Sequence, residues 1–181
     1  PEVFHPEGLP MHISVIATDF DGTISSGDQL APGAAQVLRR WRQAGQVAVA
    51  MCEAAVETIA EGVPEYEISL AALNAGTRRA AELIGTKNGP SHFSPLIHNL
   101  QVLQSGPNLS MVHGRPTLRR IEKGDPIYMC FCPFTLFKQI KLGFDREFFV
   151  GRVSDEHAKI YETALEAQAA ALAMIRPGVP A

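Results

Sequence analysis

Two aspartates near the start of the chain stand one residue apart, a spacing that could support phosphoryl transfer. Asp19 and Asp21 flank Phe20 in the stretch "ATDFDGTI", directly after the apolar run "ISVIA". On a strand, side chains two residues apart share a face, so both carboxylates would point the same way. Such a pair can hold Mg²⁺ and place one oxygen for in-line attack on phosphorus. The other interpretation is a turn whose aspartates accept hydrogen bonds from nearby backbone amides.

The stretch "DFDGT" resembles the first motif of the haloacid-dehalogenase phosphatases, D-x-D-G-T. This resemblance implies an Mg²⁺-dependent phosphatase that uses Asp19 and Asp21. The family also needs a second strand that ends in Ser or Thr, but the chain reads "QVAVAMCEAAVETI" there, with unbroken helical spacing. A motif without its structural context favours the polar turn, and the phosphatase is kept as the alternative function.

A histidine in the middle of the chain is a candidate for proton transfer. His113 lies in "MVHGRPT", where glycine and proline indicate a loop. An imidazole titrates near neutrality, so it can both accept and donate a proton during a reaction. A loop histidine can equally serve as a hydrogen-bond partner of the backbone, so its role depends on the sequence around it.

Composition and charge exclude several classes of function. The chain has 181 residues, 46% of them hydrophobic, and a net charge of −3, which suits one globular domain without a general basic surface for nucleic acid. No apolar run approaches the roughly 18 residues of a membrane span. Its three cysteines, Cys52, Cys130 and Cys132, form neither a disulfide framework nor a zinc-binding pattern. We therefore expect a cytoplasmic protein that binds neither nucleic acid nor membranes.

The spacing of apolar residues predicts the elements that must position these candidates. The pattern predicts, in chain order, a strand at 12–18, helices at 34–60 and about 64–84, strands at 100–104, 126–132 and 145–151, and a helix at 154–176. The last helix has Ser154 as its N-cap. Helices come first and strands later, which indicates an α+β fold and not repeated βαβ units.

From about Arg42 to Ala181 the chain resembles the catalytic domain of the M24 family, the "pita-bread" proteins that include methionine aminopeptidases, prolidases and creatinases. The stretches that carry the resemblance are "RQAGQVAVAMCEAAVETIAEGVPEYEISLAA", "QSGPNLSMVHGRPTLRRIEKGD", "DREFFVG" and "SDEHAKIYETALEAQAAALAMIRPGV". It implies a partial pita-bread fold, with long helices, then antiparallel strands and a closing helix. It divides the chain into an unassigned N-terminal segment, 1–41, and the N-terminal half of an M24 domain, 42–181.

The resemblance also locates the positions at which M24 peptidases carry their first two metal-binding aspartates. Cys130 and Gly143 occupy these positions here. A thiol and a glycine cannot hold hard divalent ions as bridging carboxylates do. The creatinases share this loss, and they hydrolyse a C–N bond of a small non-peptide substrate without a metal. The resemblance therefore implies no cofactor, and only the phosphatase alternative requires Mg²⁺.

Similarity to the creatinases also implies roles for individual residues. His113 corresponds to the proton-transfer residue, and Asp145 to the acidic residue that binds the cationic group of the substrate. Asp145 is shorter than the glutamate that creatinase has there. Arg146 completes the substrate-binding pair and is expected to act mainly as a support, because adjacent strand residues point to opposite faces. The expected partners are a small-molecule substrate and a second copy of the chain in a homodimer.

An M24 domain carries its remaining site residues on a second half of similar size. The chain ends at "IRPGVPA", near the middle of that fold. We therefore expect the chain to be inactive on its own. Three hypotheses follow: a metal-free, creatinase-like hydrolase, a phosphatase that uses Asp19, or a catalytically silent fragment that serves in assembly or binding.

Overall fold

The computed structural model describes part of the chain, namely residues 3–4, 25–26, 29–30, 33–85, 94–97, 102–131, 135–138, 140–143, 145–176 and 178. The strand predicted at 12–18 and the aspartates Asp19 and Asp21 lie outside these residues. In the described part, no helix combines the length and the apolar character that crossing a membrane would require.

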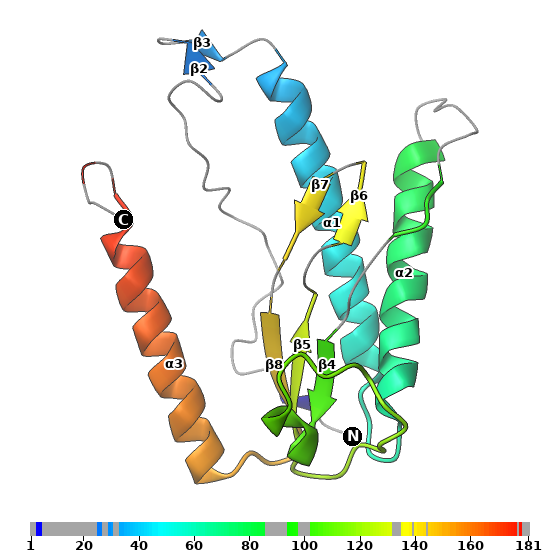
Figure 1. Ribbon diagram of the computed structural model, residues 1–181, viewed down its shortest axis with the longest axis vertical. Coiled ribbons are helices and arrows are strands. Elements are labelled where there is room, and N and C mark those ends of the chain that lie inside the picture. The colour runs from blue at the N-terminus through cyan, green and yellow to red at the C-terminus, as the bar shows by residue number, and fades with distance from the viewer. Residues whose placement is uncertain are drawn as a thin grey trace.

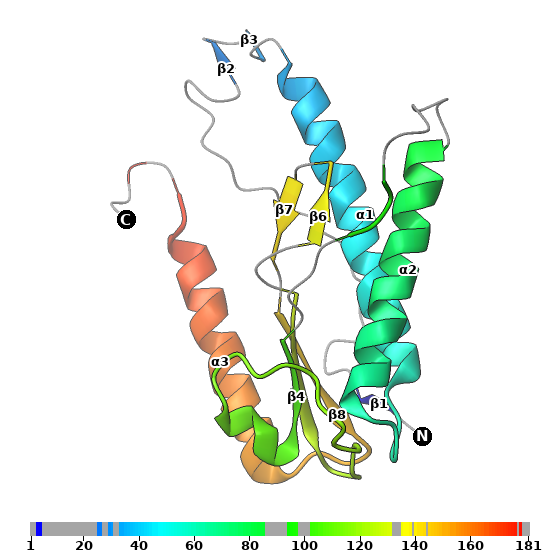
Figure 2. The ribbon, with the colours of Figure 1, turned by 45° about the vertical axis from the view of Figure 1, so that its right-hand side comes forward.

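Two long helices, α1 (Ala34–Thr58) and α2 (Glu65–Gly85), form one layer of the fold. Figures 1 and 2 both show them side by side. Their close approach depends on small residues, because a Cβ on Gly76 of α2 would lie 2.5 Å from Met51 Cγ of α1. Both predicted helices are confirmed, with ends that differ by only a residue or two.

An antiparallel sheet forms the second layer, with the strand order β1-β8-β5-β4. Its strands are β1 (Val3–Phe4), β4 (Val102–Ser105), β5 (Pro126–Cys130) and β8 (Asp145–Val150). The predicted strands at 100–104, 126–132 and 145–151 correspond to β4, β5 and β8. The edge strand β1 was not predicted, and it joins the N-terminal segment to the sheet through antiparallel pairing with β8.

Two β-hairpins outside this sheet were also not predicted. One consists of β6 (Thr135–Phe137) and β7 (Ile140–Leu142), and both of its strands contact α1. Phe137 is buried in the core, which explains how such short strands are held. The other hairpin, β2 (Ser25–Ser26) with β3 (Gln29–Leu30), precedes α1.

The register of the sheet separates its two faces. In the β5–β8 pairing, Met129 lies opposite Arg146 and Cys130 lies opposite Asp145. Met129 belongs to the core that the sheet forms with α1 and α2. Because side chains alternate along a strand, Cys130 and Asp145 lie on the other face, which we call the open face.

The last helix, α3 (Asp155–Met174), lies on the opposite side of the sheet from α1 and α2 (Figures 1 and 2). Its predicted N-cap is confirmed, since Ser154 Oγ accepts a hydrogen bond from the His157 N–H. The His157 ring also contacts Phe149 of β8, with 6.0 Å between ring centroids. No residue of α3 is buried, and large apolar side chains such as Ile160 and Leu172 are each 61% exposed.

The thiol of Cys52 on α1 is buried in the helical layer and should be chemically inert. Burial raises its pKa from 9.0 to about 11, an effect that the charge of Arg146 partly offsets. Only the thiolate reacts with alkylating agents. We therefore expect iodoacetamide at about pH 8 to leave Cys52 unmodified in the folded chain and to modify it in denaturant. Peptide mass spectrometry measures this, and equal labelling rates in both states would contradict it.

The same shift predicts a pH dependence of stability. The folded pKa of Cys52 lies above its ordinary value of 9.0, so the folded state favours the neutral thiol. The neutral thiol of Cys52 therefore makes its full contribution to the free energy of unfolding below about pH 9. This contribution is lost as the pH rises toward 11.

Candidate functional site

The loop that carries His113 follows a short 3₁₀ helix, η1 (Gly106–Ser110), and precedes β5. His113 is exposed and adopts a left-handed backbone conformation, with φ of 54°. Such a conformation is uncommon for a residue other than glycine, so other contacts must stabilise the turn. The neighbouring Val112 is 88% exposed, which places this part of the loop in solvent.

The side chain of Gln104 on β4 holds this loop through hydrogen bonds to its backbone. Its Nε2 donates hydrogen bonds to the carbonyl oxygens of Asn108, at 2.5 Å, and Met111. A Cβ on Gly114 would lie 2.6 Å from the same Nε2, so the loop packs directly on the amide. Gln104 pairs with Tyr128 in the sheet and therefore lies on the open face. The loop of His113 thus covers part of that face.

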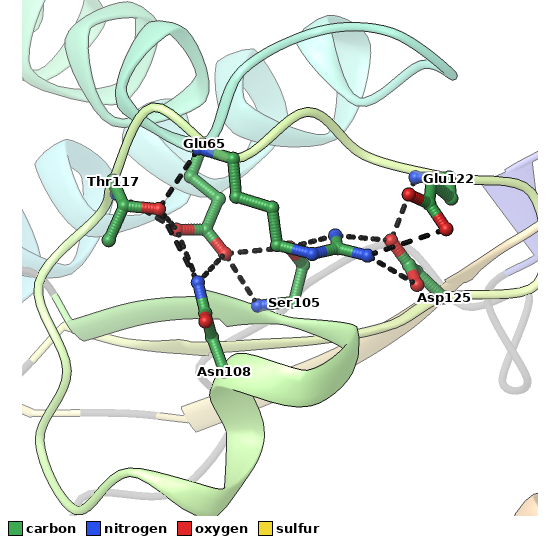
Figure 3. Close-up of polar contacts among 7 residues, drawn as sticks. Glu65, Ser105, Asn108, Thr117, Glu122 and Asp125 are labelled. Atoms are coloured by element: carbon green, nitrogen blue, oxygen red, sulfur yellow. Dashed lines mark hydrogen bonds and ion pairs between the residues drawn. The ribbon is translucent and has the colours of Figure 1, made fainter.

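Both ends of the loop are bonded to one carboxylate, that of Glu65 at the start of α2. Glu65 Oε1 accepts hydrogen bonds from Ser105 N (2.8 Å), Ser105 Oγ (2.6 Å) and Asn108 Nδ2 (3.2 Å). Its Oε2 accepts from Thr117 N (2.8 Å) and Thr117 Oγ1 (2.7 Å). Figure 3 shows the carboxylate between these residues. Glu65 has no exposed surface, and both of its oxygens are hydrogen-bonded.

A charged pair extends this network toward β5. Arg119 Nη1 donates to Asp125 Oδ2 (2.6 Å) and to Ser105 Oγ (2.8 Å), and Nη2 donates to Asp125 Oδ1 (3.2 Å). Asp125 Oδ2 also accepts the backbone N–H of Glu122 at 2.7 Å, a contact drawn in Figure 3. The pair therefore fixes the turn that leads into β5.

The two residues predicted to bind substrate lie on different faces of β8. Asp145 is exposed on the open face, and its proximity to Tyr128 contributes, after burial, to raising the pKa of that phenol. Arg146 lies opposite Met129 on the helix side, where its charge acts on Cys52. The fold therefore brings Asp145, but not Arg146, to the face that the His113 loop covers.

A second carboxylate on the open face was not identified from the sequence. Glu147 lies opposite Tyr128 in the register and follows Asp145 by two residues, so the period of a strand could have revealed it. Burial raises the pKa of Glu147, and the charge of His157 on α3 acts in the opposite direction. The open face therefore carries two acidic groups on one strand.

The two positions that the family resemblance matched to metal-binding aspartates, Cys130 and Gly143, carry no carboxylate here. Cys130 is 3% exposed and disulfide-bonded, so the expectation of no disulfide was wrong. Gly143 has no side chain, and neither residue supplies a carboxylate oxygen. Among the residues that the structure describes, no three His, Cys, Asp or Glu side chains are grouped so that they could hold a metal ion. A metal pair bridged by carboxylates therefore lacks its ligands at these two positions.

Comparison with known families identifies the fold. Residues 39–181 match the sequence profile of metallopeptidase family M24. The chain belongs to metallopeptidase family M24. This M24 chain is 33% identical over 126 residues to the agropine synthesis cyclase of Rhizobium rhizogenes. The match covers 68% of this chain and 31% of the cyclase. It is 31% identical over 125 residues to the creatinase of Bacillus sp. (strain B-0618), covering 69% of itself and 28% of the creatinase.

A solved M24-type structure has the same fold. The prolidase from Pyrococcus horikoshii OT3 superposes with a TM-score of 0.61 and 24% identity, over 75% of this chain and 35% of the prolidase. The predicted family and the partial pita-bread fold are thus confirmed. This M24 chain spans about a third of the length of the curated relatives that it matches.

Proposed function

We propose that residues 42–181 are the N-terminal half of the catalytic domain of an M24 hydrolase that cleaves a C–N bond in a small, non-peptide, cationic substrate. The observation that carries this proposal is the position of the His113 loop over the sheet face that presents Asp145. Family membership supports the hydrolase chemistry, and neither of the two curated relatives is named as a peptidase.

The proposed roles follow from the chemistry of each side chain. His113 accepts a proton from water as the oxygen attacks carbon, and it then donates a proton to the departing nitrogen. Asp145 provides the negative charge that binds the cationic end of the substrate. The Tyr128 hydroxyl can donate to Asp145 and orient the carboxylate, and burial followed by the charge of Asp145 raises the pKa of this phenol.

The remaining site residues come, in this proposal, from the second half of an M24 domain. The exposed apolar residues of α3 give such a half a surface to cover, since Leu172 and Met174 are each 61% exposed. The test uses this chain joined to the second half of an M24 catalytic domain. The assay compares the rate of hydrolysis of small ureas, guanidines and amides with that of Xaa-Pro dipeptides. Cleavage of the dipeptides alone would overturn the proposal.

Metal independence is a separate prediction, because Cys130 and Gly143 supply no carboxylate. Protein purified without added metal should contain no stoichiometric divalent ion by elemental analysis, and a chelator should leave hydrolysis unchanged. An M24 peptidase that retains both metal-binding aspartates is the control and should lose activity in the chelator. One or two equivalents of Mn, Co or Zn per chain would contradict the prediction.

The similarity to the agropine synthesis cyclase favours one second candidate, a ring-closing enzyme that acts on a small molecule. The mass of the product separates the two reactions, because hydrolysis adds water and a condensing ring closure releases it. The phosphatase alternative stays a prediction, since Asp19 and Asp21 lie outside the described residues. The homodimer and the cytoplasmic location also stay predictions.

A further inference from the structure

Glu65 is a buried acid that the proposed reaction does not use. Its side chain is fully buried at the first residue of α2, and it accepts hydrogen bonds from Ser105, Asn108 and Thr117. Burying a carboxylate is costly unless hydrogen bonds or opposite charges compensate for the lost water. All five of the close contacts come from N–H or O–H groups, so hydrogen-bond donors take the place of the lost water around both oxygens.

The donors lie on both sides of His113 in the sequence. Ser105 and Asn108 precede it, and Thr117 follows it, so the loop begins and ends at the same carboxylate. Backbone bonds reinforce the second attachment, because the Glu65 N–H donates to the carbonyl oxygen of Arg119 at 2.9 Å. The segment before α2 is also bridged to the loop's exit, through Pro64 and Arg120.

We propose that Glu65 is the positioning residue of the His113 loop. By holding both ends of the segment 106–116 against the rigid start of α2, its carboxylate determines where His113 lies above the open face. The catalytic meaning of this position rests on the proposed function, whereas the positioning itself does not. The Glu65 side chain thus adds to the backbone bonds that connect the helix layer to the end of the loop.

A glutamine at position 65 tests this idea with almost no change of shape. Its amide would direct N–H groups toward donors of Ser105 or Thr117, so at least one former acceptor position would face a donor. We expect Glu65→Gln to speed hydrogen exchange of the amides in 106–116 by about tenfold or more, relative to the amides of β5. The control is Glu67→Gln, which makes the same change on an exposed residue of the same helical turn.

The measurements use the 181-residue chain below its unfolding temperature. Hydrogen exchange with mass spectrometry reports on the loop, and the imidazole NMR signals of His113 report on its surroundings. We expect these signals to move in Glu65→Gln and to stay in Glu67→Gln. Thr117→Val, which removes one donor to Oε2 and keeps the side-chain shape, should give a smaller change in the same direction.

Two outcomes separate this inference from its alternatives. If Glu65→Gln only lowers the melting temperature, and both loop exchange and the His113 signals match the control, Glu65 is merely structural and the proposal is overturned. If Glu65→Gln does not fold, Thr117→Val decides by the same two readouts. A loosened loop with unchanged turnover in the completed domain would support the positioning and count against the proposed function.

Discussion

Replacing His113 by alanine should lower kcat by about 10²- to 10⁴-fold in an M24 domain completed with its second half. The expected loss is that of a general acid and base, because no other group on the loop can accept a proton from water near neutrality. Steady-state kinetics with a cationic C–N substrate measure it. Val112→Ala is the control, since Val112 is the exposed neighbour on the same loop.

A companion variant separates binding from chemistry. Asp145→Asn removes the charge that is proposed to bind the substrate, so KM should rise more than kcat falls. His113→Ala should show the opposite pattern, with kcat reduced and KM changed less. If His113→Ala retained full kcat, the proton-transfer role would be wrong, and the catalytic group would have to be sought elsewhere in the completed domain.

Replacing Asp125 by alanine should destabilise the fold by about 2–4 kcal/mol, because it removes one partner of a largely buried ion pair. The side chains of Arg119 and Asp125 are only 18% and 10% exposed. Without Asp125, the guanidinium of Arg119 loses its closest counterion and keeps the more distant carboxylate of Glu122, at 3.8 Å, and the Glu122 N–H loses its acceptor. The free energy of unfolding from urea titration measures the loss.

A matched ion pair in the same chain provides the control. Arg79 and Glu82 lie one turn apart on α2, and their side chains are 37% and 62% exposed. Breaking this pair with Glu82→Ala should cost less than about 0.5 kcal/mol, since exposed helix pairs are well solvated. Equal losses for Asp125→Ala and Glu82→Ala would show that burial does not strengthen the Arg119 pair.

The parts of the fold that local periodicity encodes were predictable from sequence. Apolar residues three and four apart gave α1, and the N-cap Ser154 gave the start of α3. Alternation along β8 indicated that Asp145 and Arg146 would lie on opposite faces, and the register confirms this. Glycine and proline indicated the loop of His113, whereas its role came only from the family resemblance and stays a prediction.

The network around Glu65 could not be predicted in the same way. Its partners Ser105 and Thr117 lie 40 and 52 residues further along the chain, so no local pattern connects them. An acidic residue in the first turn of a helix is also common, because it suits the positive end of the helix dipole. The pairing of β1 with β8 likewise depends on contacts between opposite ends of the chain.

No residue of α3 is buried, and its half-buried residues, such as Tyr161 and Leu165, all lie between residues 157 and 165. A ring contact joins His157, in the first turn of α3, to Phe149 of the sheet. The whole helix has 20 residues, which at 1.5 Å per residue makes it about 30 Å long. A rotation of only about 10° at the first turn would therefore move the far end by about 5 Å. The orientation of α3 therefore depends less on the sheet than on any surface that packs along the helix.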